Sequence, residues 1–194
     1  LIIFQEQKVS RALIDKDAIY SAEGTPMTTS GIQVIGQIQA YAGNYGISTN
    51  PESFAVYGYR KYFADKNQNA ILRLSQDGIT EISAYGMIGY FRDNLALISP
   101  ESKVLGGWDI HNKQYVVSMQ PKGSDYYQTV SFDEESNGWT STFSYKPDFM
   151  LNLRNNYYTL KNGNIWLHYA EPQATSINYC NFYGAQYNAS VKLI

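Results

Sequence analysis

The chain has 194 residues, of which 44% are hydrophobic and 16% charged, and its formal net charge is −2. These values support a packed core, exclude an intrinsically disordered chain, and argue against a basic nucleic-acid-binding face as the main feature. A single cysteine, Cys180, excludes an internal disulfide framework. No apolar run approaches the ~20 residues that span a bilayer, so no membrane span is expected.

Tyrosine dominates the aromatic residues, with 18 Tyr against 8 Phe and 3 Trp. Tyrosine suits pleated, half-buried surfaces and interfaces where one end of the side chain stays wet. The composition therefore indicates strands and extensive contact surface.

The first expected element is a short helix over residues 31–45. Its apolar residues Ile32, Ile35 and Ile38 fall on one helical face, and Ser30 is a candidate N-cap. Three glycines in this window weaken the helical signal. We expect residues 1–50 to be an N-terminal segment with this helix that leads into a β domain.

Residues 52–83 predict a β meander, because apolar and β-branched runs are interrupted by "KNQN" and "QDG". The period then changes over residues 85–99, where Ile88, Phe91, Leu95 and Ile98 recur at helical spacing and Pro100 follows. This second pattern predicts a short amphipathic helix.

From residue 103 onward, strand patterns return in pairs around short corners. The expected hairpins are 103–110 with 114–120, 126–134 with 138–146, and 155–161 with 164–170; residues 181–187 and 189–194 are also strand-like. The third corner is Asn162-Gly163, a pair that suits the positive φ angles of a type I′ turn.

The expected fold class is mainly β, with antiparallel meander blades of a β-propeller-like domain and one or two short helical insertions. Four-strand units would recur near the ~40–45 residues of propeller blades. Residues 51–194 then hold about three blades, whereas a closed propeller needs roughly 4–8. Because the chain also begins at Leu1 rather than Met, we expect a piece of a longer protein; an open sandwich is the alternative.

Two Asp-Gly corners partly resemble the Asp-box of sialidase-type propellers. Ser75, Asp77, Gly78 and Thr80 match some of its outline, whereas the Asp133–Gly138 corner has the wrong spacing. Asp and Gly hold the backbone angles of turns, and an Asp-box is itself a hairpin element. The residues expected to form hairpin corners without chemistry are Asp77, Gly78, Gly138, Asn162 and Gly163.

No catalytic, cofactor-binding or metal-binding residues are expected. The spacing of the carboxylates does not bring together the two that a glycosidase needs; they are Asp15, Asp17, Glu81, Asp93, Asp109 and Asp133. His111, His168 and Cys180 are isolated from one another, which fits neither a Cys–His nucleophile nor a zinc site. The scattered basic residues, Arg60 and Arg73 among them, indicate solvated strand faces.

Three tryptophans could serve either the core or a ligand. Trp108, Trp139 and Trp166 lie in predicted strands, where aromatic rings dominate core packing. They are also candidate interface aromatics, or aromatics that stack on sugars.

The order of several segments resembles the tail muzzle proteins, which are nozzle-like, of crAss-like podoviruses. These segments are "YGISTNPESFAVYGYRKYFADKNQNAILRLSQDGITEIS", "YGMIGYFRDNL", "GGWDIHNKQYVVSM", "TVSFDEESNGWTSTFSYKPDFM" and "NIWLHY…NFYGAQYNASVKLI". The resemblance covers roughly residues 12–194 and implies a fragment of a longer chain.

The resemblance implies a non-enzymatic structural protein located in the virion, at the distal end of a phage tail, without a cofactor. It would close the tail barrel and retain genome and cargo until ejection. Its implied partners are other copies of itself, ring or barrel subunits, and packaged cargo proteins or DNA in the lumen. A glycan- or receptor-binding β module of a tail is the alternative hypothesis, and a sialidase-like glycoside hydrolase is the second.

Overall fold

The computed structural model describes residues 1–14, 18–20, 26–28, 35–170 and 179–191. It is mainly β, with 48% strand and 9% helix, and its sheets are antiparallel. This confirms the expected fold class at that level. No closed barrel or propeller is identified in the described ranges.

The N-terminal sheet has the order β1-β2-β5, with β1 (Ile2–Phe4), β2 (Val9–Ile14) and β5 (Ile35–Ala40). A separate two-stranded sheet pairs β3 (Ala18–Tyr20) with β4 (Pro26–Thr28). The expected helix over 31–45 is wrong in its described part, because residues 35–40 form β5. The edge of β2 supplies hydrogen-bond partners to this glycine-containing stretch, and pairing with β2 overrides its weak helical periodicity. Residues 31–34 lie outside the described residues.

The second sheet is a four-stranded meander, and the sequence predicted it. Its strands are β6 (Ala55–Tyr57), β7 (Arg60–Asp65), β8 (Ala70–Ser75) and β9 (Gly78–Glu81), in that order across the sheet. The first predicted run is divided by a two-residue loop at Gly58 and Tyr59, where Gly58 has a φ of 56°.

Helix α1 (Ile88–Ala96) confirms the second helical prediction. Phe91 and Leu95 are fully buried, and Ile98 is nearly so. Ile88 was expected on the same face, but its side chain is 60% exposed because it begins the helix. Two short 3₁₀ helices, η1 (Pro51–Ser53) and η2 (Ile82–Ala84), flank the second sheet.

The third sheet confirms two of the predicted hairpins. It contains β10 (Lys103–Asp109), β11 (Gln114–Gln120), β12 (Gln128–Asp133) and β13 (Gly138–Phe143) in chain order. Both faces of its first three strands are covered, whereas Thr140, Ser141 and Thr142 of β13 are exposed. One face packs against the second sheet and α1 through Trp108 and Val117, and the other packs against the fourth sheet through Leu105 and Val116.

The fourth sheet contains β14 (Phe149–Leu153), β15 (Asn156–Lys161) and β16 (Asn164–Leu167). A small hairpin of β17 (Asn181–Phe182) and β18 (Ala185–Gln186) follows. Strand β14 was not predicted from the sequence, because its turn into β15 uses Arg154 and Asn155, both with positive φ, instead of an Asn-Gly pair.

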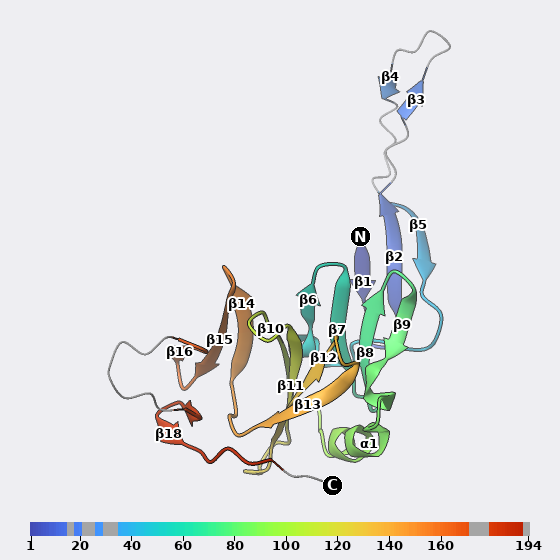
Figure 1. Ribbon diagram of the computed structural model, residues 1–194. Coiled ribbons are helices and arrows are strands. Elements are labelled where there is room, and N and C mark those ends of the chain that lie inside the picture. Colours follow the sequence, from blue (N-terminus) through green and yellow to red (C-terminus); the bar gives the residue numbers. More distant parts are fainter. Residues whose placement is uncertain (15–17, 21–25, 29–34, 171–178, 192–194) are drawn as a thin grey trace.

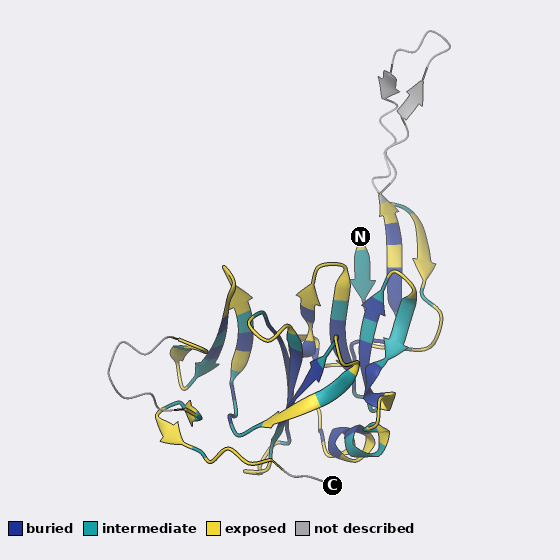
Figure 2. Cartoon of the chain, in the orientation of Figure 1, coloured by how far each residue is buried: buried dark blue, intermediate teal, exposed yellow. Residues whose placement is uncertain are grey.

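The sheets pack face to face in sequence order, and buried residues concentrate between them (Figures 1 and 2). The first strands of the second, third and fourth sheets lie next to one another, since β10 contacts both β6 and β14. Close packing at β10 requires glycine. A Cβ on Gly106 would lie 1.9 Å from the Ser53 carbonyl oxygen, and one on Gly107 would lie 2.7 Å from Met150 Cβ.

Candidate functional site

The predicted corner residues all lie at hairpin turns. Asp77 is in the two-residue loop between β8 and β9, and Gly78 follows it with a φ of 108°. Asn162 and Gly163 have φ values of 51° and 75°, as a type I′ turn requires. Gly138 begins β13.

A second corner design was recognised from the sequence at one place only, the Asp133–Gly138 corner. Asp65, Asp109 and Asp133 each end a strand, and each carboxylate accepts hydrogen bonds from the backbone N–H groups two and three residues later. Each is followed, four residues on, by a residue with positive φ: Asn69, Lys113 and Asn137. The detectable signal was an Asp at a strand end four residues before Asn or Lys. These carboxylates therefore serve turn geometry.

The remaining predicted carboxylates are dispersed. Asp93 forms an exposed pair with Arg92, with 2.9 Å between Oδ1 and Nε, and Glu81 accepts a hydrogen bond from Ser83. Asp15 and Asp17 lie outside the described residues. No group of three or more metal-ligating side chains is found in the ranges that the structure covers.

The two histidines, which were expected to be isolated from one another, both lie beside the ring of Tyr169, whose centroid is 6.1 Å from that of His168. The His111 ring stacks on Tyr169 with centroids 4.5 Å apart. His168 Nε2 lies 2.8 Å from Thr159 Oγ1, and burial lowers the pKa of His168 to about 4. Within the described chain, no hydrogen bond joins Cys180 to either imidazole.

The tryptophans are mostly structural. Trp108 is 1% exposed and belongs to the core, which is one of the two roles that the sequence left open for it. Trp139 is half-buried, packs on Phe91, and donates from Nε1 to the Ile82 carbonyl oxygen. Trp166 is half-buried and meets Tyr183 edge to face.

Four aromatic rings form a stacked column across the interface between the second and third sheets. In order they are Tyr57, Trp108, Tyr62 and Tyr115, with successive centroids 4.3, 5.3 and 4.9 Å apart and interplanar angles of 10–21°. Tyr115 is fully buried, whereas Tyr57 is 38% exposed and forms the outer end of the column.

Glu134 joins the same two sheets through a shared ion cluster. Its Oε2 lies 2.7 Å from Arg73 Nη1 and 3.3 Å from Arg60 Nη1, and Tyr62 donates to its Oε1 over 2.5 Å. Burial, followed by the Glu134 carboxylate, raises the pKa of Tyr62. The sequence prediction of a solvated Arg73 is wrong, because its side chain is only 16% exposed. Sequence carried no sign of this contact, since Glu134 is 61 residues from Arg73.

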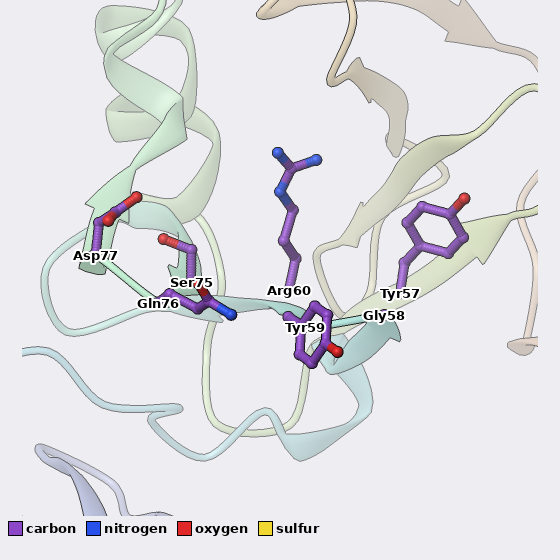
Figure 3. A pocket seen from close by; sticks show the side chains of 7 residues that line it. All are labelled: Tyr57, Gly58, Tyr59, Arg60, Ser75, Gln76 and Asp77. Carbon is purple, nitrogen blue, oxygen red and sulfur yellow. The ribbon is translucent and has the colours of Figure 1, made fainter.

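A pocket of about 450 Å³ lies between the β6–β7 and β8–β9 turns, beside this cluster (Figure 3). The side of the first turn is formed by Tyr57, Gly58, Tyr59 and Arg60, and the side of the second by Ser75, Gln76 and Asp77.

The pocket combines aromatic rings, a guanidinium and one carboxylate. Figure 3 shows Arg60 rising between Tyr57 on one side and Ser75 and Asp77 on the other. Asp77 is the one carboxylate among the described lining residues, whereas acid–base hydrolysis of a glycoside uses two. The arrangement therefore suits ligand binding.

No helix in the described part of the chain is long and apolar enough to cross a membrane. No protein-family model matches this sequence, and no curated protein matches it either.

Proposed function

We propose that this chain is a non-enzymatic structural module of a phage tail, built from blade-like sheets and placed in the distal muzzle or nozzle. The meander order of the second, third and fourth sheets and the contacts of β10 with β6 and β14 support the blade arrangement, since propeller blades are meanders arranged around an axis. The resemblance of the ordered segments to tail muzzle proteins supports the location.

The observation that carries the proposal is an apolar face on the fourth sheet that no other described element covers. Paired residues in neighbouring strands point to the same side, so two rows cross this face: Phe149, Leu160 and Ile165, then Leu151, Tyr158 and Leu167, with Leu153 beyond them. None of these residues is charged. Ile165 is 71% exposed and Leu153 is 58% exposed, and Figure 2 colours much of β14 and β16 as exposed.

The opposite face of the same sheet is also apolar, and the third sheet covers it. Met150 and Tyr157 on that face are buried against Leu105 and Val116 of the third sheet. We infer that the uncovered face receives a further antiparallel sheet with an apolar face of its own. The stack of sheets would then continue into the rest of the tail assembly.

The size of the face argues against a second copy held by this contact alone. Three strands spaced ~4.8 Å apart and five residues at ~3.3 Å each give a footprint of roughly 240 Å². Even twice that area, to allow for side-chain relief, is less than the ~800 Å² per partner of a standard stable interface. A sheet that other contacts already hold close to the chain can bind through a smaller interface on this face, because those contacts lower the entropic cost of association.

In the proposed role, the module helps to close the tail barrel and retain genome and packaged proteins until ejection. Its partners would be further copies arranged in a ring and neighbouring barrel subunits. Rigid face-to-face packing suits a part that must resist internal pressure, because close-packed interiors have low compressibility.

The location is tested by immuno-electron microscopy on purified particles of the phage that encodes this sequence. Antibodies raised against the recombinant chain are expected to label the distal end of the tail. Labelling of the capsid, or no labelling of particles that contain the protein by mass spectrometry of disrupted virions, contradicts the proposal.

The apolar face is tested by introducing Ile165→Glu into the phage. A buried unpaired charge costs several kcal/mol, so incorporation into particles should fall by at least about tenfold. The matched control is Ile88→Glu, at a residue that is 60% exposed on α1, and it should leave incorporation unchanged. Equal incorporation of the two variants would rule out this face as the site of assembly.

A further inference from the structure

The pocket between the β6–β7 and β8–β9 turns has a preformed aromatic wall. Tyr57 lies parallel to the buried Trp108, with centroids 4.3 Å apart and an interplanar angle of 10°. One face of the tyrosine ring is thus occupied, and the ring is held in place while 38% of the residue stays exposed at the pocket. An immobilised ring is a good stacking platform, because little conformational entropy is lost when a ligand packs against it.

The guanidinium of Arg60 gives the pocket a positive group. Arg60 and Arg73 share the single carboxylate of Glu134, so this cluster carries one excess positive charge. Arg73 is the closer partner, at 2.7 Å against 3.3 Å, and Arg60 keeps 45% of its side chain exposed. The five N–H donors of a guanidinium leave Arg60 able to bind a second carboxylate.

The β8–β9 turn gives the opposite side of the pocket a different chemistry. Asp77 and Gln76 are exposed there, facing Arg60 across the opening (Figure 3). A carboxylate and a side-chain amide accept hydrogen bonds from hydroxyl groups, and the amide also donates. The pocket therefore has a positive side, a hydroxyl-binding side and an aromatic surface.

We propose that this pocket binds a saccharide unit that carries a carboxylate. The sugar ring packs on Tyr57, its carboxylate pairs with Arg60, and its hydroxyl groups bind Asp77 and Gln76. This inference goes beyond the proposed structural role, and it places recognition on residues other than the three tryptophans.

An acidic peptide matches the pocket less well than an acidic sugar. A glutamate side chain supplies a carboxylate for Arg60 but no hydroxyl group for Asp77. A second carboxylate nearby would be repelled by Asp77, since like charges at close range disfavour binding. The sugar satisfies both sides of the pocket at once.

The test is a titration of the recombinant chain, at physiological ionic strength, with 3′-sialyllactose, lactose and a capped glutamate tripeptide. The test variant is Arg60→Met, which keeps the aliphatic stem, and Arg73 remains to pair with Glu134. The matched control is Lys66→Met, which removes a cation from the β7–β8 turn, at the opposite end of the strands from the pocket. Circular dichroism checks that both variants are folded.

We expect saturable binding of 3′-sialyllactose by the wild type, and lactose and the tripeptide should each bind at least about tenfold more weakly. Arg60→Met should lose about tenfold in affinity for the acidic sugar, whereas Lys66→Met should stay within about twofold. The proposal is overturned if the wild type shows no saturation up to about 10 mM. Equal binding of lactose or the tripeptide overturns it too, as does equal weakening by the two variants.

Discussion

The ion cluster around Glu134 offers a sharp test of what holds the second and third sheets together. Glu134 lies in the β12–β13 turn, and its carboxylate reaches Arg73 on β8 and Tyr62 on β7. The Glu134 and Arg73 side chains are only 11% and 16% exposed. The substitution Glu134→Ala therefore leaves Arg73 largely buried without its counter-charge, and Tyr62 without its hydrogen-bond acceptor.

The expected loss in the free energy of unfolding follows from this burial. Removing one partner of a buried ion pair costs about 3–5 kcal/mol. Because both side chains keep some exposure to water, we expect a value near the lower end, about 3 kcal/mol, with the lost Tyr62 hydrogen bond included. With an m-value of about 2 kcal/mol/M, the urea midpoint should fall by about 1.5 M.

The assay is urea unfolding followed by tryptophan fluorescence, since Trp108 and Trp139 lie at the interface between these sheets. Glu135→Ala is the matched control, because Glu135 is the next residue in the same turn and is exposed. It should change the free energy by less than about 0.5 kcal/mol. A Glu134→Ala variant within about 1 kcal/mol of the wild type, or equal to Glu135→Ala, would refute this account of the interface.

Three further variants test individual contacts by the same unfolding assay. Gly106→Ala should cost more than about 3 kcal/mol or prevent folding, because its Cβ would meet the Ser53 carbonyl oxygen, a backbone atom that also accepts the Tyr115 hydroxyl. Gly163→Ala points into open space and should cost only about 1 kcal/mol, from its φ of 75°; equal costs for the two would contradict the packing described at β10. The pKa of His168 is about 4 in the folded chain, so the unfolded chain takes up its proton first as the pH falls from about 6.5 to 4. Stability should fall over that window by up to about 1.4 kcal/mol per pH unit, and His168→Gln should flatten the profile; parallel profiles would show that His168 is not held neutral.

Local sequence signals predicted much of the architecture, because they act between residues close in the chain. Asn162-Gly163 has the left-handed backbone angles that it indicated, and the 3.6-residue period of Phe91 and Leu95 identified α1. The same reasoning failed where local preferences were weak. Residues 35–40 became β5 because the edge of β2 was available, and β14 was missed because its turn lacks glycine.

The candidate pocket could not be predicted from local patterns. From the sequence, Arg60 was one of several scattered cations and Asp77 was a corner residue. The two residues face each other because β7 pairs with β8, which brings the β6–β7 and β8–β9 turns to the same end of the sheet. Tyr57 and Trp108 are 51 positions apart in the sequence, and their stacking depends on the contact between β6 and β10. Glycan stacking was assigned to tryptophans instead, because ring size is visible in a sequence and exposure is not.

The sequence by itself determined that the chain forms paired antiparallel strands with corners at Asp77 and Asn162, since backbone angles and side-chain alternation are set by neighbouring residues. Only the tertiary structure decided which polar groups meet. Glu134, in a turn of the third sheet, reaches Arg73 on the second, and an apolar row ending at Ile165 stays exposed among the described residues. The physical reason is that burial and charge pairing depend on distance in space, which the order of residues along the chain does not specify.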